Sequence, residues 1–239
     1  MPNFTSYKLV EACREPGCPI CRLEQQGVER YLDNQFYENV NSPAWRDHLR
    51  ASQGFCHEHA WLAVHKRLGD PLGFSIVYHD VINNLLKSLP DNARSTPAPE
   101  RRASVLGQGS ASLRNRIEAL LNSLVPQKRC PACEYRDELT HSIFAGLVAD
   151  LPRSELTDAL QASDGLCLPH LRRALGSVKS ELEYESLLTI HRAKLENLKN
   201  ELAEFIRKND YRVIKEGFGS EGDAWLRSIS LMIGSRKER

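Results

Sequence analysis

The chain has 239 residues, of which 41% are hydrophobic and 26% are charged, and its formal net charge is +1. These values are ordinary for a globular protein that buries one core or two small ones. The near-neutral charge excludes attraction of nucleic acid or anionic membranes through the overall field, and no apolar run is long enough to span a bilayer. We therefore expect no membrane partner.

The first residues, Met1-Pro2-Asn3-Phe4-Thr5, have neither the basic nor the apolar region of a signal peptide. This favours a cytoplasmic protein. Thiols stay reduced in the cytoplasm, so closely spaced cysteines there indicate metal ligands rather than disulfides.

The first half of the chain shows helical spacing throughout. Apolar residues over 20–36 predict a helix that begins within the first cysteine pair. Ser42-Pro43 then predicts the start of a second helix, which Gly54 ends. A third helix is expected to begin at 56–59, and a fourth to run over about 72–89. The following stretch, 91–110, is rich in Pro, Ser, Gly and Arg and is typical of a linker.

The second half repeats this order of elements. Helices are expected over about 112–124, 134–150 and 154–161, and another from Cys167. A long helix over about 178–209 would span about 45 Å. A last amphipathic helix is predicted to face inward with Trp225, Leu226, Ile229, Met232 and Ile233.

No run of residues alternates in the manner of β-strands, so the predicted fold class is all-α. We expect a first helical repeat over 1–90 and a linker over 91–110. A second repeat over 111–239 would include the long helix and the C-terminal amphipathic helix.

The strongest signal is a pair of cysteine motifs that occurs in both halves. Six of the seven cysteines belong to these motifs. A Cys-x-x-Cys pair is followed by a Cys-x-x-His pair each time, and the second copy lies 112 residues after the first at Cys18 and Cys130. Three thiolates and one imidazole complete a tetrahedral metal shell. The sequence predicts that each half closes its own site, with the residues Cys18, Cys21, Cys56 and His59 in the first and Cys130, Cys133, Cys167 and His170 in the second.

Two zinc ions are the preferred cofactors, because a closed ligand set with no open position is typical of structural zinc. An iron–sulfur cluster is the alternative. It is indicated by Cys13, which extends the first pair to Cys-x4-Cys-x2-Cys, a spacing found in plant-type ferredoxins. We favour a free, partly buried Cys13.

Two histidines outside the motifs, His79 and His191, are also 112 residues apart. They either line a second polar site or are hydrogen-bonded core residues, and we favour the second interpretation. Arg173, beside the second site, is one of several cations that either balance its charge or are solvated surface residues, and the sequence favours neither interpretation.

The motifs at 15–23, 54–61, 130–133 and 165–170 together resemble an uncharacterised prokaryotic family of unknown function with paired Cys-Pro-x-Cys and Gly-Phe/Leu-Cys-x-x-His motifs. The segments 209–212 and 222–225 are similar to the C-terminal end of that family. The resemblance covers nearly the whole chain. It implies bacterial or archaeal origin and paired metal sites, and it brings no known activity.

The sequence contains no phosphate-binding glycine loop, no nucleophile elbow and no paired acid and base, so we name no catalytic residues and favour a protein that is not an enzyme. The leading hypothesis is a metal-stabilised helical scaffold or adaptor that binds another protein. An iron–sulfur electron-transfer protein is the alternative. A regulator that binds nucleic acid, indicated by the linker arginines and the basic end at 236–239, is the weaker one.

Overall fold

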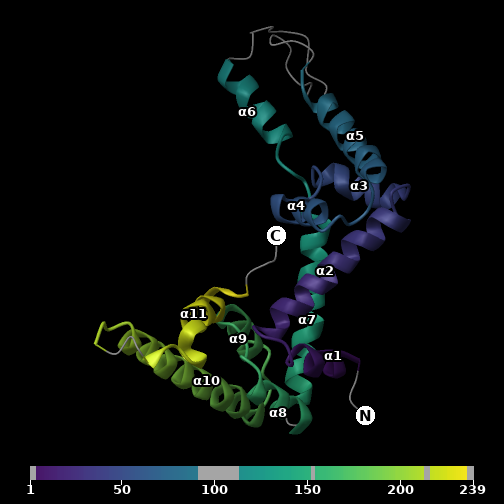
Figure 1. Ribbon diagram of the computed structural model, residues 1–239. Helices are drawn as coiled ribbons and strands as arrows, with labels where there is room; N and C mark the ends of the chain where they lie inside the picture. The colour runs from purple at the N-terminus through teal and green to yellow at the C-terminus, as the bar shows by residue number, and fades with distance from the viewer. Residues whose placement is uncertain (1–3, 91–112, 152–153, 213–215, 236–239) are drawn as a thin grey trace, which may run out of the picture. The chain divides into compact units, whose positions relative to one another are not determined.

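The structure is a computed structural model that describes residues 4–90, 113–151, 154–212 and 216–235. Within these ranges every regular element is a helix, which confirms the predicted all-α class (Figure 1). The helices are α1 (Phe4–Ala12), α2 (Pro19–Glu38), α3 (Pro43–Ala51), α4 (His57–His65), α5 (Pro71–Ser88), α6 (Leu113–Ser123), α7 (Pro131–Asp150), α8 (Ser154–Ala162), α9 (Leu168–Leu175), α10 (Glu181–Lys208), the 3-10 helix η2 (Ser220–Asp223) and α11 (Ala224–Ile233).

The chain forms two compact units, with boundaries that fall inside α2 and α7. Unit 1 contains Met1–Val28 and Arg136–Arg239, and unit 2 contains Glu29–Tyr135. The expected division into 1–90 and 111–239 differs from this one, because the N-terminal segment packs with the C-terminal half. The predicted linker, 91–110, lies outside the described residues.

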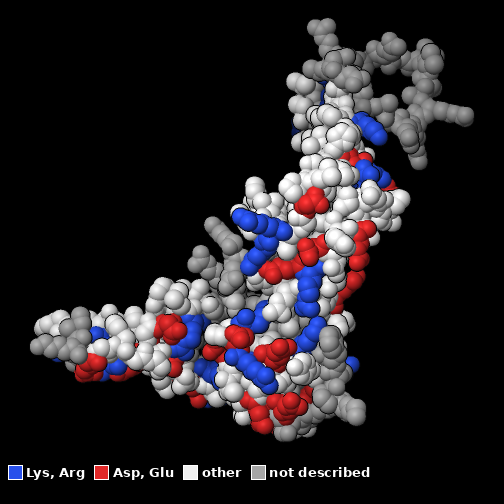
Figure 2. Space-filling view, turned by 45° about the vertical axis from the view of Figure 1, so that its right-hand side comes forward, with Lys and Arg blue, Asp and Glu red and all other residues white. Residues whose placement is uncertain are grey.

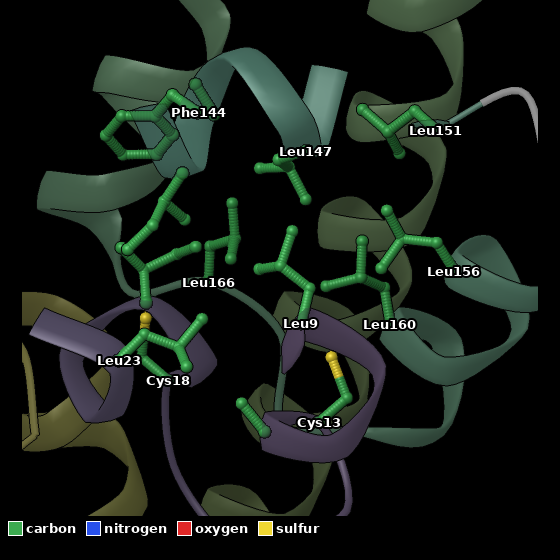
Figure 3. Packing of buried hydrophobic residues seen from close by; sticks show 14 of the residues in the cluster. Leu9, Cys13, Cys18, Leu23, Phe144, Leu147, Leu151, Leu156, Leu160 and Leu166 are labelled. Atoms are coloured by element: carbon green, nitrogen blue, oxygen red, sulfur yellow. The ribbon is translucent and has the colours of Figure 1, made fainter. Parts of the chain in front are cut away.

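Unit 1 has an aliphatic core to which α1, α2, α7, α8, α9 and α10 all contribute (Figure 3). Helix α1, which the sequence analysis did not predict, packs against α8 and buries Leu9 completely. The core continues to the cysteine motifs, since Cys18 and Cys167 are members of the same buried cluster. The cysteines of this unit are thus held by a packed interior.

Helix α10 lies close to its predicted limits. Its start is fixed by a reciprocal capping box, in which Ser180 accepts from the N–H of Glu183 and the Glu183 carboxylate accepts from the N–H of Ser180. Only part of the apolar side of α10 is covered, because His191 and Leu198 are buried whereas Leu195 is 48% exposed.

The prediction that the apolar residues of α11 face inward is wrong. They are among the exposed large hydrophobic side chains of the described chain, namely Trp225, Leu226, Ile229, Met232 and Ile233. Helix α11 instead packs against α10 and η2 through buried Ala224 and through Arg227, which donates to the carboxylates of Glu201 and Asp223. The helical spacing of these apolar residues predicted the helix correctly, but it did not predict which side of the helix is buried.

Unit 2 is built around aromatic side chains. The ring of Phe36 stacks on Phe74 at 4.0 Å between centroids and contacts Trp45 and Phe55 at 5.8 and 5.7 Å. Helix α3 packs on α5, which buries Gly73, Val77 and Val81, each one turn after the last, and leaves Ile82 54% exposed.

Among the described residues, no helix combines the length and the apolar character that crossing a bilayer would require.

Candidate metal centres

The eight predicted ligand residues gather into two groups of three cysteines and one histidine. We call the first group site 1 and the second group site 2. Site 1 contains Cys18, Cys21, Cys167 and His170, and site 2 contains Cys56, His59, Cys130 and Cys133. Within each group the four candidate ligand atoms lie within 4.8 Å of one another. Site 1 belongs to unit 1 and site 2 to unit 2.

The predicted pairing of the motifs is wrong. Each half was expected to close its own site, but each site combines the Cys-x-x-Cys pair of one half with the Cys-x-x-His pair of the other. The lengths of the helices explain the exchange. Helix α2 has 20 residues and advances the chain by about 30 Å, whereas α3 has only 9 residues and returns it by about 14 Å. The second helix is too short to bring the chain back to the start of the first.

Both Cys-x-x-Cys pairs and both Cys-x-x-His pairs lie at helix N-termini. Cys18 and Cys130 come directly before the prolines that begin α2 and α7. Cys56 and Cys167 are the N-caps of α4 and α9, with φ and ψ of −65° and 165° in one and −64° and 157° in the other. The positive end of a helix favours thiolate over thiol, so each site receives two such ends.

The distances in both sites fit one four-coordinate ion. In site 1 the sulfurs of Cys21 and Cys167 are 3.8 Å apart, and Nδ1 of His170 lies 3.2 to 3.4 Å from the three sulfurs. A tetrahedron with zinc–sulfur bonds of about 2.3 Å has sulfur–sulfur edges of about 3.8 Å and sulfur–nitrogen edges of about 3.6 Å. The imidazole therefore presents Nδ1 as its candidate ligand atom.

Site 2 repeats this geometry. The sulfurs of Cys56 and Cys133 are 3.6 Å apart. Nδ1 of His59 lies 3.3 Å from the sulfur of Cys56, 3.6 Å from that of Cys130 and 3.4 Å from that of Cys133. The two groups are thus near-copies, although they are assembled from opposite motif pairs.

Crowding of the thiols makes their joint ionisation depend on a cation. Burial, together with the neighbouring Cys130 and Cys56, raises the pKa of Cys133 to about 12. Contacts with Cys167 and Cys21 likewise raise the pKa of Cys18. Like charges this close cannot all form unless a positive ion offsets them. A divalent ion at the centre of each group would supply that charge.

Site 1 has a carboxylate behind its histidine that the sequence analysis did not identify. An oxygen of Glu24 lies 3.2 Å from Nε2 of His170 and another lies 3.5 Å from the guanidinium of Arg173. The hydroxyl of Thr140 also donates to this carboxylate. Such a partner fixes the ring orientation of a metal-binding histidine and leaves Nδ1 for the ion. The available signal was the position of Glu24, three residues after Cys21 on the same helix face.

The segment after α11 lies over site 1. The N–H of Cys18 donates to the hydroxyl of Ser235 at 3.2 Å. A Cβ at Gly234, whose φ is +99°, would lie 3.5 Å from the sulfur of Cys21 and 3.9 Å from that of Cys167. These distances are ordinary van der Waals contacts, so the positive φ rather than a lack of space favours glycine at this position.

The other residues singled out in the sequence lie outside both sites. Cys13 is packed in the core with Leu9 and Leu160 (Figure 3), and burial raises its pKa to about 11. His79 is exposed on α5 and bonds to the side chain of Asn83, whereas His191 is buried.

Comparison with known proteins gives a family without an assigned activity. Residues 6–239 match a family model described as a family of unknown function, DUF6062. The chain belongs to this family. An uncharacterised 23.9 kDa protein in the xynA 3′ region of Caldicellulosiruptor sp. (strain Rt8B.4) is 25% identical over 233 residues, which cover 95% of this chain and 100% of that protein. No solved structure matches the chain significantly.

The exchanged pairing predicts which cysteines share an ion. We expect the double variant Cys21→Ser/Cys167→Ser to keep about one metal ion per chain, because it damages site 1 alone. The double variant Cys21→Ser/Cys56→Ser should keep none, because it damages both sites. Elemental analysis of the soluble proteins measures this. Pairing within each half predicts the reverse result, so the two variants serve as controls for each other.

Proposed function

We propose that the protein is a zinc-stabilised helical scaffold that holds one zinc ion in each unit and binds another protein. The observation that supports metal binding is the convergence of three sulfurs and one imidazole nitrogen within 4.8 Å, twice in one chain. Both ligand sets are complete with protein atoms, which is typical of structural rather than catalytic zinc.

Zinc suits this donor set better than the hard cations. Thiolates are soft ligands that select zinc, copper(I) or iron–sulfur clusters, whereas magnesium and calcium prefer oxygen. Three thiolates with a divalent ion leave about one negative charge. In site 1 the helix N-termini offset that charge, and Arg173 balances the added charge of the Glu24 carboxylate behind His170.

The ion in each site would connect helices that are distant in sequence. In site 1 it would join the start of α2 to the start of α9, and in site 2 the start of α4 to the start of α7. Because such a site does not exist in the unfolded chain, its binding free energy contributes directly to folding. This is the role that we propose for both ions.

The alternative of an iron–sulfur protein receives less support. Cys13 belongs to neither ligand group, so Cys13 does not join Cys18 and Cys21 in one set of candidate ligands. In an iron–sulfur cluster the protein ligands are distributed over several iron atoms. The four candidate ligand atoms of each site here lie within 4.8 Å of one another, an arrangement that fits a single ion.

The weaker alternative, a regulator that binds nucleic acid, rests on arginines at 94–102 and 236–239, outside the described residues. On the face shown in Figure 2, acidic and basic side chains are intermixed over the described helices.

The proposal of a protein partner is supported by the outer face of α11. Its exposed apolar residues recur at helical spacing, and Ile229 is 49% and Ile233 74% exposed. Contiguous exposed apolar side chains commonly mark interaction surfaces.

We expect protein purified without air to be colourless and to contain about two zinc ions per chain. Removal of the ions by a strong chelator should lower the thermal midpoint by about 10 °C or more, since several kcal/mol of folding free energy are lost. Elemental analysis, a visible spectrum and thermal unfolding measure these quantities. A brown, iron-containing preparation would contradict the assignment of zinc.

For the partner, we expect Ile229→Glu to reduce capture of specific proteins by the tagged chain from a lysate of its source organism, without changing the metal content. Ser228→Glu, on the same helix and half-buried, is the control for added charge. Quantitative mass spectrometry compares the captured proteins. The same capture by the wild type and by Ile229→Glu would count against this face as the interaction surface.

A further inference from the structure

Each unit contains one buried hydrogen bond directly before its Cys-x-x-His turn. In unit 1 the N–H of Leu166 donates to Nε2 of His191 at 2.9 Å. Nδ1 of His191 lies 2.8 Å from the carbonyl oxygen of Leu187, so Nδ1 carries the proton and Nε2 is the acceptor. Both Leu166 and His191 are buried, at 1% and 3% exposure.

In unit 2 the hydroxyl of Tyr78 takes the corresponding place. Burial raises the pKa of Tyr78, and a hydrogen bond from the backbone of Phe55 to the hydroxyl oxygen acts in the opposite direction. Phe55 comes directly before Cys56, as Leu166 comes directly before Cys167. Each acceptor also lies close to the glycine before the bonded residue. A Cβ built on Gly54 would lie 3.4 Å from the hydroxyl oxygen of Tyr78, and a Cβ built on Gly165 would lie 3.6 Å from Nε2 of His191.

The two turns have the same backbone path. Gly54 and Gly165 have φ of +91° and +78°, and the two cysteines that follow one residue later have nearly identical φ and ψ. The bonded N–H belongs to the residue between glycine and cysteine. It therefore fixes the direction in which the chain enters the helix and in which the cysteine sulfur leaves it. Because both N–H groups are on buried residues, loss of the acceptor would leave a costly unpaired donor.

We propose that His191 and Tyr78 are positioning residues that hold the Cys-x-x-His turns of site 1 and site 2 in metal-binding geometry. This inference rests on the proposed metal-binding function. It assigns the counterpart of His191 to Tyr78 and not to His79, the residue that the 112-residue offset would select. His79 bonds instead to Asn83 on the exposed side of α5.

Tyr78→Phe removes only the acceptor oxygen. We expect it to lower the apparent affinity of one of the two zinc ions by about 10- to 100-fold, the usual effect of losing a partner outside the ligand shell. His191→Leu should have the same effect on the other ion. His191→Gln, which retains an acceptor at a similar reach, should recover most of the loss. Competition with a chromophoric chelator measures the two ions as separate phases.

Site-specific variants assign each phase to an ion. The phase altered by His191→Leu should be the one lost in Cys167→Ser, and the phase altered by Tyr78→Phe the one lost in Cys56→Ser. His79→Leu and Tyr37→Phe, both at exposed positions of unit 2, are the matched controls and should leave both phases unchanged. Wild-type affinities in Tyr78→Phe and His191→Leu would overturn the proposal, as would an equal loss at both sites in each variant.

Amide hydrogen exchange gives a second readout that does not require metal. The N–H groups of Phe55 and Leu166 should be protected in the wild-type chain and should exchange faster in Tyr78→Phe and His191→Leu, respectively. Loss of this protection with zinc still bound normally would show that the bonds are structural only. If the wild-type protein binds no metal although both N–H groups are protected from exchange, the proposed function is wrong but the two hydrogen bonds stand.

Discussion

The structure depends on bringing three buried or half-buried thiols and an imidazole to one point, in each of two units. Without a cation this is unfavourable, because thiolates within 4 Å of one another repel and thiols at that distance resist ionisation. With a divalent ion the same crowding becomes a tetrahedral shell. Helix N-termini also help to offset the negative charge of the thiolates, since both Cys-x-x-Cys pairs and both Cys-x-x-His pairs begin a helix. We therefore propose that an ion at each site is part of the fold.

The exchange of motifs between the halves gives each ion a long-range role. The ligands of site 1 lie up to 152 residues apart in the chain and those of site 2 up to 77. An ion held by such ligands would close a large loop of the chain. Closing the loop costs conformational entropy, and the bound ion would then stabilise the two distant segments that supply its ligands. Site 1 is further enclosed by the carboxylate of Glu24 and by the backbone at Gly234, so an ion bound there would lie at the edge of the packed core of unit 1.

The sequence predicted most of the helices and the eight candidate ligand residues that gather in the two groups, but not how the motifs pair. Spacing of three residues at a helix start constrains only local geometry, so the members of each motif were predictable. Which two pairs share an ion depends on how far α2 and α3 move the chain, and this made the predicted pairing wrong. The stripe on α11 had a helical period, but a period does not state which side is buried. Tyr78 was missed as the counterpart of His191 because two chemically different acceptors perform one task.

The most direct test of the account is X-ray absorption at the zinc edge of the full-length protein. Two ions of the proposed kind predict an average shell of three sulfurs at about 2.3 Å and one nitrogen at about 2.0 Å, with no neighbouring metal atom. A short metal–metal distance, or a shell of oxygen and nitrogen without sulfur, would contradict the claim that each group of thiols holds one ion.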